Sequence, residues 1–144
     1  MQEIEQMVTG FDYLSKDKDL QQHWLRRFVA IVIDALIIYA PINFFFSLVG
    51  ANGFLVFFLT GGLFFFYTAA FDLIASGTFG KMLMHLKTVS MKGKLDLPQA
   101  LMRNVSKLFA LLLLLDWIIG MAVDTNDPRQ KWTDQLAGTS VILQ

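Results

Sequence analysis

The feature that most constrains this chain is an apolar run from Phe28 to Phe71 in which Asp34 is the only formally charged residue. The chain has 144 residues, and 55% of them are hydrophobic. A soluble domain of this length could not bury so much apolar surface, because small domains keep a large share of their surface in water. A hydrocarbon solvent removes this difficulty. The sequence therefore predicts a small integral membrane protein, with the lipid bilayer as its main partner.

About 20 apolar residues are enough to cross the hydrocarbon core as a helix. Three segments qualify, at about residues 28–49, 53–75 and 105–123, although the third contains Lys107 and Asp116. The sequence between the first two segments, Gly50-Ala51-Asn52-Gly53, is typical of a turn, so we expect a tight antiparallel hairpin. The prediction is an all-α membrane protein with a cytoplasmic N-terminal segment (1–24) and one membrane domain (25–144).

The distribution of Lys and Arg predicts the orientation, because cytoplasmic loops are enriched in these residues. Residues 76–104 contain five Lys or Arg and a single acid, Asp96, whereas the turn at 50–53 is uncharged. We therefore expect a multi-pass protein of the cell membrane with its N-terminus and the 76–104 loop in the cytoplasm.

The 76–104 loop also contains a signal for β-structure. The sequence HLKTVSM alternates apolar and polar residues, Lys92-Gly93 is a turn signal, and LDL follows, which predicts a small hairpin between the second and third helices. The last residues, 137–143, have the pattern of a further strand. If that strand paired with the loop, both would lie on one side and the third apolar segment would be re-entrant. The sequence is compatible with both arrangements.

The acids inside the apolar segments have two interpretations. Asp34 lies seven residues after Arg27, so both side chains share one helix face about 10 Å apart along the axis, within reach of a long Arg side chain. The pair could be a structural ion pair that fixes the register of the helix. Alternatively, Asp34, Asp72 and Asp116 could form a cluster that binds a proton or a cation, because neighbouring carboxylates raise one another's pKa. Asp72 could also simply reach the lipid headgroups.

Three motifs in this order resemble the RDD family of small membrane proteins. RRFVAIVID is similar to the family's opening, an Arg at the mouth of the first helix followed by an Asp within it, here Arg27 and Asp34. GTFGKMLMHLKTVSMKGKLDLPQALMRN is similar to a Gly-x-Thr-x-Gly-Lys segment, a strand, a Gly turn and a helix that carries an Arg, here Arg103. RQKWTDQLAGTSVI is similar to the closing motif, with Asp134 as the second Asp.

The resemblance extends from about Leu25 to Leu143, with two departures. Thr133 stands where many members have a His, and His85 replaces a common Gly. Asp72 and Asp116 are not defining positions of the family. The resemblance implies a membrane protein for which transport of ions or small solutes is the usual suggestion, and it supplies no substrate.

These observations support two hypotheses on function. The first is a transporter or exchanger of cations, protons or small solutes. In this hypothesis Asp34 carries the proton or cation, Arg27 tunes the pKa of Asp34, and Arg103 with Asp134 closes the cytoplasmic end of this group of charges. Three short helices enclose little volume, so this hypothesis predicts a homo-oligomer. The second is a non-transporting scaffold that anchors partner proteins through its basic loop.

Other classes have less support. The formal net charge is zero, which does not favour nucleic acid as a partner. His23 and His85 are isolated and there is no Cys, so we expect no metal site. GTFGK lacks the spacing of a phosphate-binding loop, and we expect Lys81 near anionic lipid headgroups instead. No nucleophile–base arrangement is present, so we expect neither an enzyme nor a cofactor.

Overall fold

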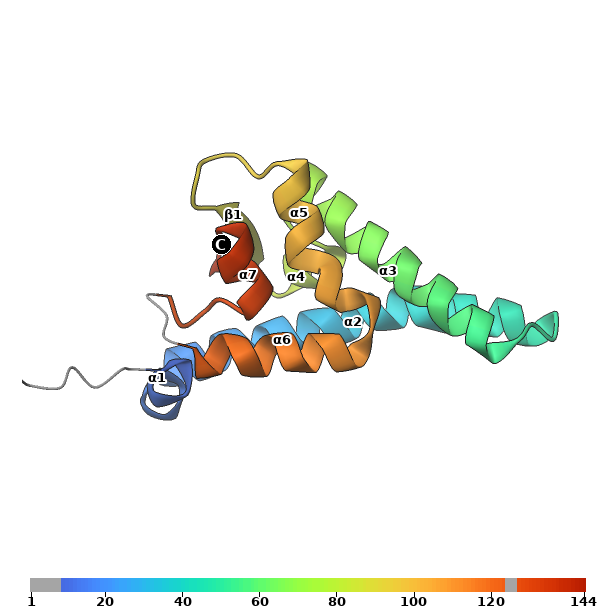
Figure 1. The fold of residues 1–144 in the computed structure, drawn as a ribbon, viewed down its shortest axis with the longest axis horizontal. Coiled ribbons are helices and arrows are strands. Elements are labelled where there is room, and N and C mark those ends of the chain that lie inside the picture. The colour runs from blue at the N-terminus through green and yellow to red at the C-terminus, as the bar shows by residue number, and fades with distance from the viewer. Residues whose placement is uncertain (1–8, 124–126) are drawn as a thin grey trace, which may run out of the picture.

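The computed structural model describes residues 9–123 and 127–144, which are mostly helical (Figure 1). The α2–α3 turn lies at one end of the molecule, and α1, α7 and the C-terminus lie at the other. The elements are α1 (Gly10–Lys16), α2 (Lys18–Leu48), α3 (Gly53–Ala75), α4 (Phe79–Leu83), β1 (Leu86–Ser90), α5 (Leu97–Asn104), the 3₁₀ helix η1 (Val105–Leu108), α6 (Ala110–Ala122), α7 (Trp132–Ala137) and β2 (Thr139–Leu143).

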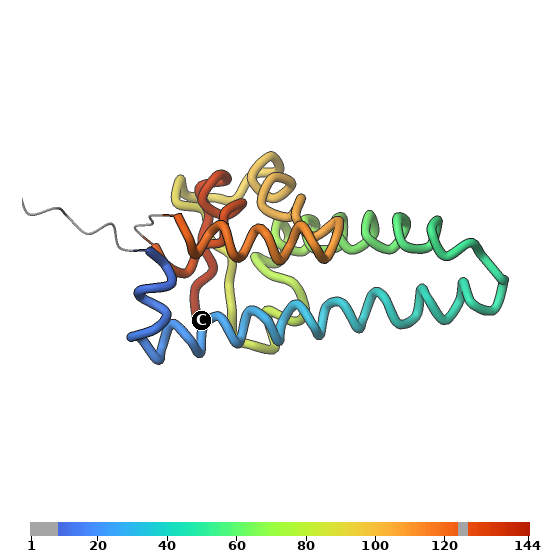
Figure 2. Tube along the Cα trace, turned by 60° about the horizontal axis from the view of Figure 1, so that its bottom comes forward, coloured from blue at the N-terminus to red at the C-terminus, as the bar shows by residue number. Residues whose placement is uncertain are grey.

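The first two apolar segments form the predicted hairpin, which extends away from the other elements in Figure 2. Gly50 adopts a left-handed conformation with φ +63°, and the Asn52 side chain caps α3 by accepting a hydrogen bond from the Phe54 N–H. Only 11% of the apolar window of α2 and 33% of that of α3 is buried within the protein. Because so many large apolar side chains face outward, both helices need an apolar solvent.

The third apolar segment is not a single straight helix. The chain is bent by 115° between Leu97–Leu108 and Ala110–Ala122, and Phe109 at the bend has extended backbone. The described residues therefore contain two helices that could cross a membrane, or three if the bent pair counts as one span. The bend has a physical cause: Ser106 and Lys107 are buried among polar groups, which a straight lipid-facing helix would not provide.

The small sheet differs from the local hairpin that the sequence predicts. β1 pairs antiparallel with β2, so that Leu86 lies opposite Leu143 and Ser90 opposite Thr139. The predicted second strand at LDL is absent, and only an isolated bridge between Ser90 and Gly93 remains of the hairpin. The remote pairing buries Leu86 and Val141 against Ala30 of α2, which gives β1 an apolar contact that a local hairpin would lack.

The N-terminal part of the described chain packs on the helices that follow. α2 begins at Lys18, before the apolar run, with the Asp17 side chain as its N-terminal cap. Leu20 and Trp24 of α2 form a small core with Met121 of α6. Gly10 lies against the Met121 backbone, where an added Cβ would come within 3.0 Å of the carbonyl oxygen. These contacts connect α1, α2 and α6 at one end of the molecule.

Candidate functional site

Most of the buried charges lie where α4, α5, α7 and the sheet pack against α2 and α3. Among the described residues, five cations and four carboxylates are buried, and we call these nine side chains the buried charge network. Its members are Arg27, Asp34, Asp72, Lys81, Arg103, Lys107, Asp116, Lys131 and Asp134. Charged groups at bilayer depth are costly unless protein groups or water surround them.

Asp34 of α2 is held by neutral donors. The Tyr67 hydroxyl donates to Oδ1 at 3.0 Å, the Gly80 N–H donates to the same oxygen at 2.8 Å, and the Thr78 hydroxyl donates to Oδ2. None of the ion pairs found among the described residues includes Asp34. The close approach depends on glycine, because a Cβ on Gly80 would lie 2.1 Å from the Ala30 carbonyl oxygen.

Arg27 does not pair with Asp34, so the predicted contact is corrected. The Arg27 guanidinium forms an ion pair with Asp134 of α7 at 2.9 Å and donates to the Arg129 carbonyl oxygen. It also lies over the Trp24 ring, 4.8 Å from the centroid. Helix periodicity correctly places Arg27 and Asp34 on one buried face of α2, but the Asp134 side chain of α7 reaches Arg27 and supplies its carboxylate partner.

Asp134 connects Arg27 to a longer chain of alternating charges. The Nη2 atom of Arg103, in α5, lies 3.0 Å from Asp134 Oδ1, and its Nε atom lies 3.6 Å from Asp72 Oδ2. Asp72 accepts hydrogen bonds from the Lys81 ammonium at 2.7 Å and from the Asn104 amide at 2.9 Å. The structure therefore brings together Arg27, Asp134, Arg103 and Asp72, which come from four helices.

The prediction that Lys81 lies near lipid headgroups is also corrected, because its side chain turns into the protein. It is 5% exposed, and its ammonium contacts Asp72 and the Thr88 hydroxyl, the latter at 3.0 Å. The short helix α4, whose N-terminus is capped by Thr78, directs the Lys81 side chain toward Asp72 in the last turn of α3. The possibility that Asp72 reaches the headgroups is excluded by the same contact.

Asp116 forms a separate centre between α6 and α7. Its carboxylate pairs with Lys131 and accepts hydrogen bonds from Ser106 and from the Thr133 N–H and hydroxyl, the last two at 2.7 and 2.8 Å. Thr133 is one of the two departures from the resemblance, and here it donates to the Asp116 carboxylate. Lys107 is buried, and none of the ion pairs among the described residues includes it.

The predicted cluster of Asp34, Asp72 and Asp116 is therefore three sites rather than one. Each carboxylate has its own donors, and no contact between any two of them is found in the described part of the chain. Within those residues there is also no group of three side chains that could hold a metal ion.

The positions of the charges shift the pKa values of groups outside the apolar helices. Burial lowers the pKa of Lys81 to about 8, although the Asp72 carboxylate favours its charged form. Burial also lowers the pKa of Lys131, against the effect of Asp134 and Asp116. For Asp134 burial favours the neutral acid, but the charges of Arg103 and Arg27 outweigh it and hold the pKa below its usual value.

Several groups of the site have no clear signal in the sequence. Tyr67 and Thr78 look like ordinary residues of an apolar helix and a turn, and Lys131 looks like a solvated charge of the tail. Only the spacing of GTFGK, with Gly80 beside Lys81, indicates that this turn approaches another element closely.

The comparisons with known proteins agree with the resemblance that the motifs indicate. The family model described as RDD family matches residues 22–138, a range that contains Arg27, Asp34, Arg103 and Asp134. The comparisons with curated proteins and with solved structures find no match.

Proposed function

The chain belongs to the RDD family, and on this premise we propose that it transports or exchanges cations, protons or small solutes, with Asp34 as the exchanging group. The observation that carries the proposal is the contrast between Asp34 and the other buried acids. Asp72, Asp116 and Asp134 each have a cationic partner, whereas the donors to Asp34 found in residues 9–123 and 127–144 are hydroxyl and N–H groups. Asp34 can therefore bind a proton or a cation without breaking an ion pair.

In this proposal Arg27 has a different role from the one that the sequence suggests. It holds α7 on α2 through Asp134, and so fixes the wall of the site instead of tuning the exchanging acid. Arg103 has the same function from α5. Thr78 and Gly80 place α4 over Asp34, so that a movement of α4 would open the carboxylate to the side on which α4 lies.

The proposed topology has two crossings, α2 and α3, with the bent pair α5–α6 entering and leaving on one side. The β1–β2 pairing supports this topology, because it joins the tail to the 76–104 loop. The excess of Lys and Arg in that loop supports a cytoplasmic location for the loop, the tail and the N-terminus in the cell membrane. The outward-facing apolar side chains of α2 and α3 support assembly into a homo-oligomer whose subunits share the walls of a pathway.

The test is flux into proteoliposomes under an imposed gradient of protons or alkali cations. The Asp34→Asn variant keeps the size of the side chain and removes the exchangeable charge, so flux should fall to the level of empty liposomes. Asp12→Asn removes an exposed acid outside the apolar helices and serves as the control. Full flux through folded Asp34→Asn protein would contradict the proposal.

A scaffold that anchors partner proteins is the second candidate. Ion pairs connect α2 to α7, α5 to α7 and α6 to α7, which favours a rigid platform opposite the α2–α3 turn. A scaffold would show no flux in the wild-type protein under any gradient.

A further inference from the structure

The two short helices that carry Arg103 and Asp134 are amphipathic in the reverse sense of helices on a soluble domain. Arg103 is the only charged residue of α5 and Asp134 the only one of α7, and both are buried. α5 also buries Gln99 and Asn104, and α7 also buries Thr133. Both helices therefore direct polar side chains into the protein, whereas a surface helix of a soluble domain directs its apolar side chains there.

The opposite sides of α5 and α7 are apolar and uncharged. The Gln99 amide donates to the Ala137 carbonyl oxygen at 3.0 Å, so the two helices lie side by side, on the side of the molecule away from α2 in Figures 1 and 2. Five large apolar side chains of α5, η1 and α7 are 42–57% exposed. We call them the α5–α7 outer face: Leu97, Met102, Val105, Trp132 and Leu136.

The α5–α7 outer face continues the apolar surface of the membrane segments. The chain leaves α5 through Val105 and enters α6, where Leu111 and Leu114 are exposed. α5 and α6 together are apolar enough to lie in a membrane as a bent pair. α3 packs against α5, and Ile74 near the end of α3 is also exposed. The outer face therefore adjoins surfaces that need an apolar solvent.

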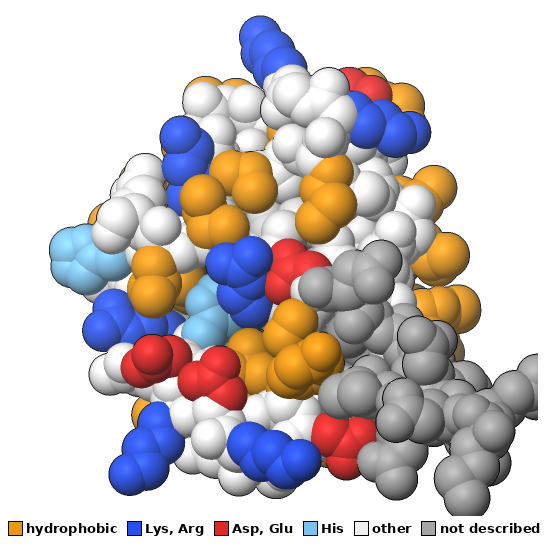
Figure 3. Space-filling model, turned by 90° about the vertical axis from the view of Figure 1, so that its left-hand side faces the viewer, with side chains coloured by type: hydrophobic (Ala, Val, Ile, Leu, Met, Phe, Trp, Pro, Cys, Tyr) orange, Lys and Arg blue, Asp and Glu red, His pale blue; other side chains and the backbone are white. Residues whose placement is uncertain are grey.

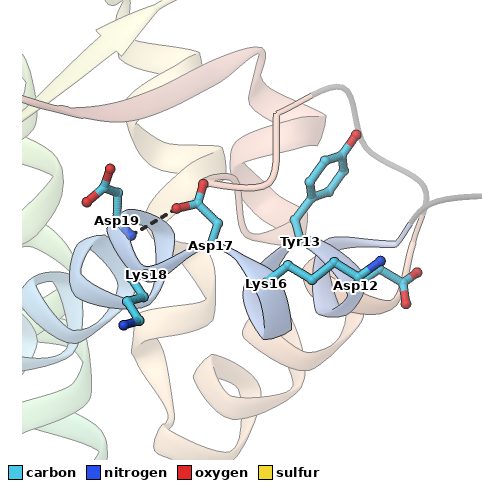
Figure 4. Close-up of a pocket in the computed structure, with 6 residues that line it drawn as sticks. All are labelled: Asp12, Tyr13, Lys16, Asp17, Lys18 and Asp19. Atoms are coloured by element: carbon cyan, nitrogen blue, oxygen red, sulfur yellow. Dashed lines mark hydrogen bonds between the residues drawn. The ribbon is translucent and has the colours of Figure 1, made fainter.

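The end of the molecule nearest to α7 has the opposite character. Figure 3 shows this end, where acidic and basic side chains gather. Figure 4 shows six exposed residues at the α1–α2 junction, whose side chains project from the ribbon in several directions. They are Asp12, Tyr13, Lys16, Asp17, Lys18 and Asp19. Because exposed charges are stable in water and costly in hydrocarbon, the aqueous phase begins at this charged end.

We propose that the α5–α7 outer face is embedded in the membrane leaflet next to the charged end, with its aliphatic side chains among the acyl chains and Trp132 at the level of the lipid headgroups. Amphipathic helices of this kind lie along the interface, with the apolar side about 5–10 Å deep. Trp suits this depth, because its ring is apolar and its N–H is polar. The partner of this face is therefore the bilayer, which covers the tail helix α7 as well as α5.

A second copy of the chain is the other apolar partner that could cover this face. Five side chains that are about half exposed cover less than the roughly 800 Å² per partner that a stable protein interface buries. The area therefore favours lipid. The inference goes beyond the transport proposal and does not depend on it, because it uses no contact of Asp34.

The experiment places one spin label at a time in the full chain in lipid nanodiscs. Electron paramagnetic resonance then measures the collisions of the label with oxygen, which concentrates in hydrocarbon, and with a polar nickel chelate, which stays in water. The chain has no Cys, so each introduced Cys is the only labelling site. Met102→Cys and Leu136→Cys test the outer face. Leu36→Cys, exposed on α2, is the lipid reference, and Lys18→Cys at the charged end is the water reference.

We expect the ratio of oxygen to nickel collisions at Met102→Cys and Leu136→Cys to exceed that at Lys18→Cys by about tenfold and to approach that at Leu36→Cys, because the chelate is nearly excluded at this depth. A ratio equal to that of Lys18→Cys would place the face in water and overturn the proposal. Few collisions with either reagent, together with dipolar broadening between labels, would assign the face to a second copy and overturn it as well. The two test positions are independent and exposed, so one folded variant, judged by wild-type circular dichroism, is enough for the decision.

Discussion

The ion pair between Arg27 and Asp134 joins two segments that are far apart in the chain, and its removal should strongly reduce stability. Arg27 is 4% exposed and Asp134 is fully buried, with 2.9 Å between the charged atoms. Removing one partner of such a pair leaves the other charge buried and uncompensated, which costs about 3–5 kcal/mol. Arg27→Met and Asp134→Asn should each lower the free energy of unfolding by this amount.

A double-mutant cycle separates this pair from the one that the sequence suggests. The double variant Arg27→Met/Asp134→Asn should lose less than the sum of the single losses, with a coupling of about 1–3 kcal/mol. The cycle of Arg27→Met with Asp34→Asn should be additive within about 0.5 kcal/mol, because Asp34 binds hydroxyl and N–H donors instead.

The assay is unfolding in mixed micelles of increasing SDS fraction, followed by fluorescence of the three Trp residues. Far-ultraviolet circular dichroism should report the same transition if unfolding is two-state. Coupling between Arg27 and Asp34 together with additivity between Arg27 and Asp134 would refute the assignment of partners.

Three further predictions concern α4 and its surroundings. Gly80→Ala should cost about 1–3 kcal/mol in the same unfolding assay, because the new Cβ would lie 2.1 Å from the Ala30 carbonyl oxygen. Gly62→Ala should cost nothing, because its added Cβ would meet no atom of the described residues within 4 Å beyond its own stretch of helix. His85→Gly should raise the free energy of unfolding by about 1 kcal/mol, because His85 has φ +56°, and unchanged stability would contradict this. Burial lowers the pKa of Lys81 to about 8 in the folded chain, while its pKa in the unfolded chain is about 10.5. Because the unfolded chain binds the extra proton between these pH values, the free energy of unfolding in an SDS titration should rise from about pH 8 to about pH 10.5. A fall over this range would contradict the burial of Lys81.

The sequence predicts the hairpin well because its signals are local. A continuous apolar run and a Gly-Ala-Asn-Gly turn place the second helix at 53–75, and α3 occupies Gly53–Ala75. The bend at Phe109 has no such signal, since neither Pro nor Gly is present there. It depends on Ser106 and Lys107 entering a polar core that segments remote in sequence build.

The same distinction applies to the site. Family membership is confirmed, and the motifs identify Arg27, Arg103 and Asp134, which the structure brings together. Their partners could not be predicted, because helix periodicity gives the face of a residue but not the element that packs on it. Lys81 shows the limit clearly: its basic loop indicates a lipid-facing lysine, and only the position of Asp72 reveals the inward turn.

The central claim is that Asp34 exchanges a proton or cation while the other buried acids stay ion-paired. The most direct measurement is infrared difference spectroscopy of carboxyl groups in nanodiscs across a pH titration, comparing wild type with Asp34→Asn. We predict a reversible protonated-carboxyl band in the wild-type protein that is missing in Asp34→Asn, with no such band from Asp72 or Asp134. A band that persists in Asp34→Asn would contradict the account, and so would an Asp34 carboxyl group whose bands change neither with pH nor with added alkali cation in the folded protein.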